Sequence, residues 1–453
     1  MNAAVRSSGG IFGDLLARVG DVGRSLALLA EDSRPQTPEA AVDLAADLLA
    51  GRGEATGLAL AQAVLDRFEA LDTAGRQSFF RLITNRFGVE RGALSSAIER
   101  WQREGDDAAA RALHYACEPR SQELLRMLNR TRGGTAALVA MRTDLLACLR
   151  QSPELRGLDA DFRHLFSSWF NRGFLELRRI DWSTSAAVLE KIIAYEAVHA
   201  IQDWDDLRRR VAAPDRQLFG FFHPALPDEP LIFVEIALTD AVPGAISPIL
   251  ARDRTPLDPD RATTAVFYSI SNCQTGLRGI SFGNFLIKQV VEVLRQELPA
   301  VRTFVTLSPV PGLRAWAQSQ LAANDSEFGP TARGVIQRLD AVDGSIDGVE
   351  AIEAVDALPE IAARYLAEAK RPDGLPLDPV ARFHLGNGAR LERIHTQADH
   401  SARGLTGAYG VMVNYLYDLD EIEKNHEAYA NDGRVMASAS VRRLLRSRAE
   451  GKR

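Results

Sequence analysis

Hydrophobic positions in the first third of the chain repeat at helical spacing. Between about residues 11 and 170, apolar residues recur every three or four positions, and polar residues fill the gaps. Proline and glycine interrupt this pattern at intervals, which marks the ends of separate helices. The predicted helices cover residues 11–29, 40–49, 58–71, 92–101, 108–117, 124–128 and 137–149. The pattern predicts a helical bundle without a catalytic motif, whose surface serves either packing alone or oligomerisation.

The remaining two thirds of the chain mix two periodicities. Short β-branched and aromatic runs predict strands, and longer amphipathic runs predict helices between them. Strands are expected at residues 174–180, 218–222, 231–238, 265–271, 303–307 and 410–417, and helices at 185–210, 286–294, 313–321, 344–370 and 441–448. The stretch 344–370 is interpreted as a solvated lid or packing element, and 441–448 as a surface tail. We therefore predict an α+β protein, with a helical domain over residues 1–172 and a mixed α/β domain over residues 173–453.

The second domain is organised around residues 263–312. This segment contains a strand, a loop with Gly276, Gly279 and Gly283, an amphipathic helix, and a second strand that ends at Ser308. Free backbone N–H groups and the helix dipole make such a loop an anion site. A parallel crossover would return Ser308 to the same edge of the sheet. The spacing fits neither a P-loop nor a dinucleotide fingerprint, and the glycines equally suit a tight turn beside a closely packed helix.

Composition and charge narrow the classes of partner. The net charge of the 453 residues is −6, which gives no basic field for nucleic acid. Cys117, Cys148 and Cys273 are far apart, so neither a disulfide framework nor a zinc site is expected. No apolar run reaches the ~20 residues that a membrane span needs, and the first residues lack the apolar core of a signal peptide. We expect a cytoplasmic enzyme that binds neither nucleic acid nor membrane.

Ser308 and His384 are the candidates for chemistry. Ser308 precedes a proline, so its backbone is restricted and its hydroxyl has few directions open to it; the alternative is a serine that starts a turn. An imidazole has a reference pKa near ~6.5 and can deliver a proton at neutral pH. His384 lies in a glycine- and asparagine-rich segment, which predicts a loop before a helix, and it could instead cap that helix. His395 and His400 are nearby competitors, and His223 is interpreted as a turn residue.

Five longer segments resemble the malonyl-CoA decarboxylase family. They are FFHPALPDEPLIFVEIAL (residues 221–238), SISNCQTGLRGISFGNFLIK (269–288), TLSPVPG (306–312), FHLGNGARLERI (383–394) and RGLTGAYGVMVNYLY (403–417). Within the second segment, residues 278–283 (RGISFG) resemble the Q/R-x-x-G-x-G/A loop with which GNAT acetyltransferases hold the pyrophosphate of coenzyme A. Ser281 stands where that pattern has its first glycine. The N-terminal third resembles the family only as a helical domain.

The resemblance implies decarboxylation of malonyl-CoA to acetyl-CoA and CO2, without metal or cofactor, in a GNAT-like catalytic domain. The serine and histidine of the family pair fall on Ser308 and His384, and Asn387 and Tyr415 would be nearby donors. The loop that grips CoA would comprise Arg278, Gly279, Ile280, Ser281, Phe282, Gly283 and Asn284. The family also implies a homo-oligomer, specifically a tetramer. Two other functions stay open: CoA-dependent acyl transfer to an amine, and a non-catalytic acyl-CoA-binding regulator.

Overall fold

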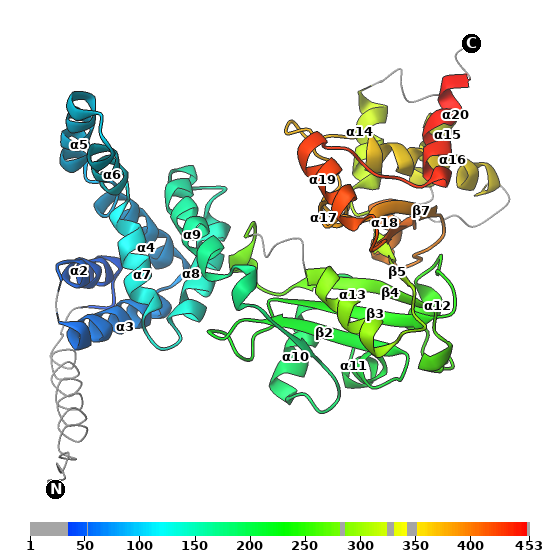
Figure 1. The fold of residues 1–453 in the computed structure, drawn as a ribbon, viewed down its shortest axis with the longest axis horizontal. Coiled ribbons are helices and arrows are strands. Elements are labelled where there is room, and N and C mark those ends of the chain that lie inside the picture. The colour runs from blue at the N-terminus through cyan, green and yellow to red at the C-terminus, as the bar shows by residue number, and fades with distance from the viewer. Residues whose placement is uncertain (1–34, 52, 281–285, 324–329, 342–350, 451–453) are drawn as a thin grey trace, which may run out of the picture. The chain divides into compact units, whose positions relative to one another are not determined.

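The computed structural model describes residues 35–51, 53–280, 286–323, 330–341 and 351–450 (Figure 1). Contacts within the chain divide it into two compact units. The helical unit comprises Met1–Phe174 together with His223–Pro227 and Gln274–Ser281, and the sheet unit comprises Leu175–Phe222, Asp228–Cys273 and Phe282–Arg453. The first predicted helix, over residues 11–29, lies outside the described residues. No helix within the described ranges combines the length and apolarity that a membrane span requires.

The helical unit is the predicted bundle. Its helices are α2 (Pro38–Leu49), α3 (Glu54–Ala70), α4 (Thr73–Arg86), α5 (Arg91–Glu104), α6 (Asp107–Ala116), α7 (Arg120–Asn129), α8 (Gly134–Cys148) and α9 (Arg156–Trp169), with short 3-10 turns η1 (Pro153–Leu155), η2 (Arg172–Phe174) and η4 (Thr275–Leu277). Phe68 packs against Phe79 and Phe80, with ring centroids 5.1 and 5.4 Å away. The sequence pattern missed α4 and α9. The start of α4 is set by Asp72, which accepts a hydrogen bond from the Gly75 N–H and caps the helix.

The sheet unit is built on one mixed sheet of eight described strands. They are β1 (Glu176–Arg179), β2 (Arg216–Phe222), β3 (Ile232–Thr239), β4 (Thr264–Asn272), β5 (Thr303–Thr306), β6 (Ser308–Pro309), β7 (Arg390–His395) and β8 (Met412–Leu416). The order is β1-β2-β3-β4-β5-β8-β6, with β7 paired to β8. Only β4 and β5 pair in parallel among these neighbours, and the helix α13 (Leu286–Glu297) connects them. This is the predicted strand–loop–helix–strand segment, and it confirms the α+β class.

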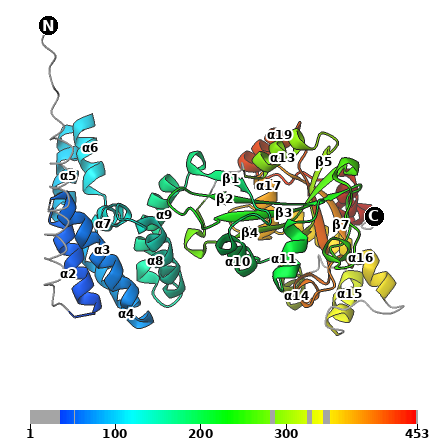
Figure 2. The ribbon, with the colours of Figure 1, turned by 90° about the horizontal axis from the view of Figure 1, so that it is seen from below.

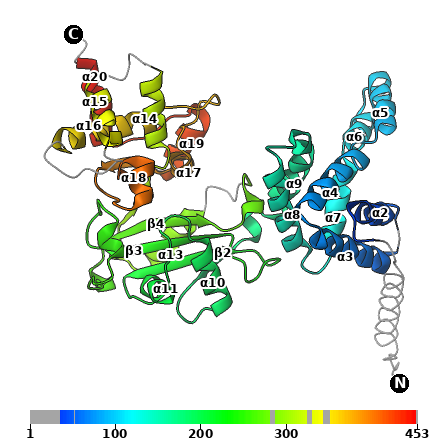
Figure 3. The same cartoon turned by 180° about the vertical axis from the view of Figure 1, so that it is seen from behind.

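Helices cover both faces of the sheet. Besides α13, the sheet unit contains α10 (Ala186–Tyr195), α11 (Trp204–Val211), α12 (Ser247–Leu250), α14 (Leu313–Ala322), α15 (Pro330–Ala341), α16 (Ala351–Ala367), α17 (Pro379–Gly386), α18 (Ala402–Ala408), α19 (Ile422–Asp432) and α20 (Ala439–Glu450), with one further turn, η3 (Pro259–Arg261). Figure 2 shows α10 and α11 on one face and α13 on the other. Apolar residues of α10 and α11 form one core with β2 and β3. The late helices α14, α15, α16 and α20 gather together (Figure 3).

Three predicted helical stretches differ from the structure. Residues 185–210 form two helices rather than one, because Asp203 caps a new start at α11. The stretch 344–370 becomes α16 within the described residues, and its buried Ile361 and Leu366 make it a packing element rather than a solvated lid. The C-terminal helix α20 is not merely a surface tail, because Val441 is buried and the helix packs against α16 and β7.

Candidate active site

Ser308 and His384 lie next to each other in the sheet unit. Ser308 belongs to β6, which pairs with β8, and His384 lies in the last turn of α17. Although 76 residues separate them in the sequence, Ser308 Oγ lies 3.1 Å from His384 Nε2. Both side chains are buried, with exposed fractions of 5% and 3%. The structure therefore brings together the two residues that the sequence singled out.

The predicted loop around His384 is wrong. Asp378 caps a helix that begins with Pro379, a favourable first helical residue, and this helix carries His384. A helix fixes the direction of the imidazole more firmly than a loop would. Asn387 ends the same helix, and its Nδ2 donates a hydrogen bond to the Phe383 carbonyl at 2.7 Å. The side-chain amide of Asn387 is thus hydrogen-bonded within its own helix.

A chain of hydrogen bonds runs through the imidazole. His384 Nδ1 lies 2.8 Å from the Tyr417 hydroxyl, and Ser308 Oγ lies 2.9 Å from Thr306 Oγ1. Thr306 Oγ1 also accepts the backbone N–H of Tyr415 at 3.1 Å. A hydrogen-bonded chain of hydroxyl, imidazole and hydroxyl groups can pass a proton in either direction. The site therefore has the parts of a proton relay.

Tyr415 of β8 and Tyr417, which follows the last residue of that strand, contact His384 in different ways. The ring of Tyr415 stacks on the imidazole, with centroids 4.6 Å apart and planes at 24°, while its hydroxyl has no hydrogen-bond partner within the described part of the chain. Tyr415 is therefore a packing neighbour and not the predicted donor. The hydrogen-bond partner of His384 Nδ1 is Tyr417, which the sequence reasoning missed. Side chains two positions apart on a strand share a face, so the spacing could have indicated both tyrosines.

Burial keeps the imidazole neutral. The pKa of His384 falls from 6.5 to about 3, because the folded protein removes the ring from water. The expected titration near neutral pH is therefore wrong for this site without substrate. Burial also raises the pKa of Tyr417 well above its ordinary value. At neutral pH the relay begins with every member uncharged.

The two competing histidines, His395 and His400, lie in separate hydrogen bonds. His395 Nε2 lies 2.5 Å from Asn414 Oδ1, and His400 Nε2 lies 2.9 Å from the Gln397 carbonyl. Neither replaces His384 at Ser308. His223 Nδ1 accepts the Ala225 N–H at 3.1 Å, which confirms its interpretation as a turn residue.

The beginning of the glycine loop belongs to the helical unit. A Cβ at Gly276 would lie 1.9 Å from the Val139 carbonyl oxygen, so only glycine allows this approach to α8. The buried Arg142 donates to the carbonyls of Gly276 and Arg278, at 2.6 and 3.0 Å. Gly276 thus has the alternative role that the sequence left open, a close helix contact. Gly279 has φ +79°, a conformation that favours glycine.

The predicted CoA loop is only partly described. The side chain of Arg278 is exposed, and Ile280 is buried. Ser281, Phe282, Gly283 and Asn284 lie outside the described residues.

A second buried polar cluster lies under β3 and β4. Arg210 donates to Glu235 at 3.2 Å, and Glu235 is fully buried. Its other carboxylate oxygen has no hydrogen-bond partner among the described residues. Burial is the main cause that raises the pKa of Glu235 to about 7, and Glu196 adds to it. A register shift between Glu235 and Ile236 places this carboxyl beside an irregular part of β4.

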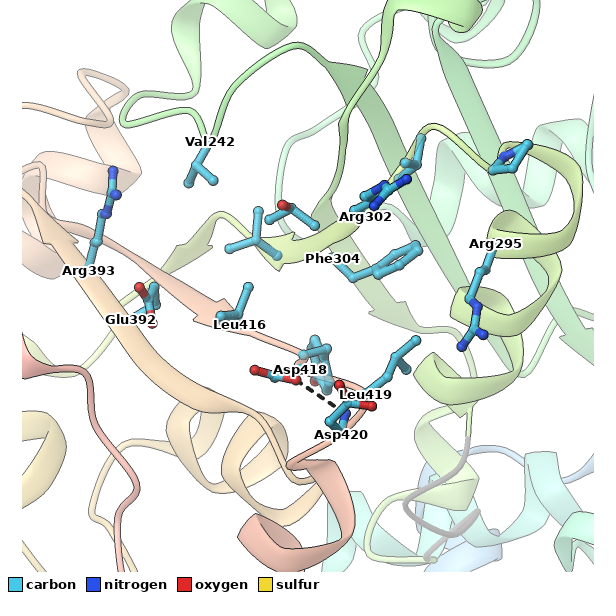
Figure 4. A pocket seen from close by; sticks show the side chains of 15 residues that line it. Val242, Arg295, Arg302, Phe304, Glu392, Arg393, Leu416, Asp418, Leu419 and Asp420 are labelled. Carbon is cyan, nitrogen blue, oxygen red and sulfur yellow. Dashed lines mark hydrogen bonds between the residues drawn. The ribbon is translucent and has the colours of Figure 1, made fainter.

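A pocket of about 680 Å³ lies beside β5 and β8 (Figure 4). Tyr417 forms part of its lining, whereas neither Ser308 nor His384 does. Its charged lining comprises Arg295, Arg302, Arg393, Glu392, Asp418 and Asp420. The three positive and three negative side chains balance, so the pocket does not select an ion of one sign.

The fold and the buried relay define a class of protein. A helical unit precedes a mixed-sheet unit that encloses a serine, a histidine and a tyrosine, which is the arrangement of an enzyme that moves a proton at an enclosed site. The model of the malonyl-CoA decarboxylase C-terminal domain matches residues 173–453, and the model of its N-terminal domain matches residues 87–170. The chain belongs to the malonyl-CoA decarboxylase family, whose members are carboxy-lyases.

Individual relatives agree with this assignment. The mitochondrial malonyl-CoA decarboxylase of Anser anser anser is 36% identical over 378 residues, which cover 78% of this chain and 72% of the relative. The crystal structure of malonyl-CoA decarboxylase from Rhodopseudomonas palustris has 51% identity and a TM-score of 0.87, covering 90% of this chain and all of that one. The crystal structure of the Agrobacterium vitis enzyme has 52% identity and a TM-score of 0.84, covering 88% and 98%.

Proposed function

We propose that the chain decarboxylates malonyl-CoA to acetyl-CoA and CO2, with Ser308 and His384 as the catalytic pair. The observation that carries the proposal is the 3.1 Å contact between Ser308 Oγ and His384 Nε2 inside a buried relay. Loss of CO2 leaves an enolate whose charge moves onto the thioester oxygen, so the substrate supplies its own electron sink. The protein must bind the thioester, orient the carboxylate and return one proton to carbon.

The proton supply follows from the low pKa of His384. The free imidazole is neutral because its pKa is about 3. A malonyl carboxylate beside Ser308 brings a negative charge next to the ring, and an opposite charge favours the protonated form. His384 then takes one proton from solvent through the relay. After CO2 leaves, that proton passes to the enolate carbon, and the imidazole returns to its neutral form.

The loop from Arg278 to Asn284 is proposed to hold the diphosphate of CoA. It precedes α13, and the N-terminus of a helix favours anions. Gly279 with its φ of +79° turns the chain there, and the exposed Arg278 offers a positive charge. Alanine at Arg278 should raise KM for malonyl-CoA and leave kcat nearly unchanged.

Product analysis tests the proposed reaction. The pure protein is incubated with malonyl-CoA and no acceptor, and acetyl-CoA and CO2 are measured. The double variant Ser308→Ala, His384→Ala should lose nearly all turnover while it keeps its folded circular dichroism spectrum. Turnover only after an amine is added would instead indicate acyl transfer. Full activity of the double variant would remove the assignment of the pair.

We further propose a cytoplasmic homo-oligomer, a tetramer. Ile98 and Trp101 of α5 and Tyr115 of α6 are exposed, with exposed fractions of 39%, 40% and 70%. Ile98 and Trp101 are three positions apart on α5 and so share one face, and an apolar face left exposed supports an interaction site there. Light scattering after size exclusion should give the mass of four chains, and Trp101→Glu with Tyr115→Glu should reduce it. A monomeric parent protein would refute the assembly, and cell fractionation tests the location.

A further inference from the structure

A tight turn of the glycine loop belongs to the helical unit. Residues 277–280 form a type II turn, because the Ile280 N–H donates to the Leu277 carbonyl at 3.0 Å and the dihedral angles between them fit that turn. Arg278 has φ −56° and ψ 128°, and Gly279 has φ +79°. The third residue of a type II turn needs a positive φ, which explains the glycine there.

The buried Arg142 of α8 sets the direction of the peptide group inside this turn. Its guanidinium is 1% exposed and donates to the Arg278 carbonyl at 3.0 Å. A trans peptide holds its C=O and N–H on opposite sides, so the Gly279 N–H points away from that guanidinium. This N–H has no hydrogen-bond partner among the described residues. The turn therefore presents an outward backbone donor in a fixed direction.

Arg163 of α9 lies beside the same glycine. The helices α8 and α9 pack against each other (Figure 1). A Cβ at Gly279 would lie 3.9 Å from Arg163 Nε, and apart from its chain neighbours it would meet no other described atom within 4 Å. Arg163, Arg278 and Gly279 are all exposed. The space beside the turn can therefore admit a ligand, and a guanidinium group borders it.

No carboxylate neutralises Arg163 within the described part of the chain. Asp159 lies four residues earlier on the same face of α9, but it forms its ion pair with Arg142 at 2.8 Å. Arg278 likewise makes no ion pair with any described residue. Guanidinium groups and outward backbone N–H groups are the donors that bind phosphate in proteins. Two unpaired guanidinium groups and one such N–H meet at this turn.

We infer that Arg163 of the helical unit binds a phosphate group of CoA, together with the Arg278 side chain and the Gly279 N–H. This inference rests on the proposed function of the loop, and it gives the helical unit a part in substrate binding besides packing. CoA carries a diphosphate and a 3′-phosphate, and both have the chemistry that these donors recognise. A ligand without the 3′-phosphate distinguishes the two.

Arg163→Ala tests the contact by calorimetric titration with CoA, which binds without turnover. The Kd should rise roughly tenfold or more, because a hydrogen bond between charged groups is lost. Arg156→Ala is the matched control, since Arg156 is also exposed and begins the same helix, about 10 Å along its axis from Arg163. It removes the same charge without the contact, so the Kd should stay nearly unchanged. Equal Kd values for the two variants would overturn the inference.

3′-Dephospho-CoA identifies which phosphate Arg163 binds. If it binds the 3′-phosphate, Arg163→Ala should weaken CoA binding and leave the binding of 3′-dephospho-CoA unchanged. If it binds the diphosphate, both ligands should weaken by the same factor. Malonyl-pantetheine has no phosphate, so the parent and Arg163→Ala should decarboxylate it with equal kcat/KM. A loss with this substrate would show that the variant disturbs the protein in another way, which would overturn the assignment.

Binding and turnover separate this inference from the proposed reaction. With malonyl-CoA, Arg163→Ala should raise KM and keep kcat, because the phosphate is held equally before and during the reaction. If the parent protein binds CoA but forms no acetyl-CoA, the proposed reaction is wrong. The Kd values of Arg163→Ala and Arg156→Ala for CoA then still decide whether Arg163 binds a phosphate.

Discussion

At the scale of single residues, the imidazole of His384 is held from three sides. Ser308 lies at Nε2, Tyr417 lies at Nδ1, and the ring of Tyr415 stacks on its face. The two hydrogen bonds control which nitrogen carries the proton, and the stacked ring excludes water. Each contact can be removed separately without emptying the space around the imidazole.

Tyr417→Phe should separate the hydrogen bond from the packing. It removes the partner of His384 Nδ1 and keeps the ring, so kcat should fall by roughly a hundredfold, the lower end of the ~10²–10⁴-fold range of general acid–base catalysis. Tyr415→Phe is the control two positions earlier, because its hydroxyl has no partner among the described residues. It should keep near-normal kcat and the same or higher stability. Steady-state kinetics of both variants decide, and a larger loss in Tyr415→Phe would contradict the assignment.

Proton uptake on binding should reveal the protonation of His384. Its pKa of about 3 leaves the free ring neutral near pH 7. A malonyl thioester analogue that cannot lose CO2 should raise that pKa and draw up to about one proton per site. Calorimetric titrations in buffers with different ionisation enthalpies measure this number. His384→Gln should bind with markedly less uptake, and equal uptake in both proteins would rule out His384 as the acceptor.

The sequence predicted Ser308 and His384 as the candidates for chemistry, but not the packing and burial around them. Ser308 and His384 stand out because their types and flanking residues suit chemistry. The 3.1 Å contact across 76 residues depends on how β6, α17 and β8 pack. The low pKa of His384 is a consequence of burial, which no local pattern displays. Tyr417 was missed, although its position two residues after Tyr415 in the predicted strand 410–417 could have indicated it.

At the scale of elements, η4 packs on α8 through a glycine. A Cβ at Gly276 would lie 1.9 Å from the Val139 carbonyl oxygen, so the backbones of η4 and α8 approach more closely than any other residue permits. The strand pattern, α13 and the parallel β4–β5 pair were predictable from periodicity. This glycine contact was not, because its partner lies 137 positions earlier.

Gly276→Ala should therefore destabilise the helical unit. The added methyl group cannot fit beside the Val139 carbonyl, so η4 must move away and weaken its bonds to Arg142. The free energy of unfolding should fall by about 2 kcal/mol or more. Gly157→Ala on α9 is the matched control, since a Cβ there meets nothing within 4 Å, and alanine favours a helix. Urea unfolding measures the free energy of unfolding of both variants. Similar losses of stability in the two would contradict the steric argument.

The pair of β3 and β4 contains a carboxyl that should make stability depend on pH. Burial raises the pKa of Glu235 from 4.5 to about 7. A raised folded-state pKa contributes stability that is complete below about pH 4.5 and is lost as pH rises through about 7. Glu235→Gln lacks this titration, and Arg210 keeps its bond to the His199 carbonyl. The stability of the parent relative to the variant should fall between about pH 5 and pH 8, by roughly 1–3 kcal/mol. Urea unfolding across this range measures it, and a constant difference would contradict the raised pKa.

At the scale of the whole molecule, no single position in the sequence separates the two units. The helical unit includes His223–Pro227 and Gln274–Ser281 from the second part of the chain. The predicted change from helical to mixed composition near residue 172 is visible in the sequence. These two returning segments are not, because they are short and have no distinctive composition.

Cutting the chain between residues 172 and 173 should therefore weaken the first part. Fragment 1–172 lacks the carbonyls of Gly276 and Arg278, which accept from the buried Arg142. A buried guanidinium without these acceptors is costly. The fragment should melt roughly 5 °C or more below the same helices in the full chain, and co-expression with fragment 173–453 should restore the difference. An unchanged melting temperature would show that the returning segments contribute little.

The buried tyrosines should make the folded protein unstable at high pH. Six of its eight tyrosines have a raised pKa, and they are Tyr268, Tyr365, Tyr409, Tyr415, Tyr417 and Tyr429. A phenol in the unfolded chain ionises near pH ~10. Above that pH the unfolded state therefore loses protons that the folded state keeps, and the folding equilibrium shifts toward the unfolded state. Most of the ultraviolet absorbance of tyrosinate should consequently appear in one cooperative step, at the same pH at which the protein unfolds.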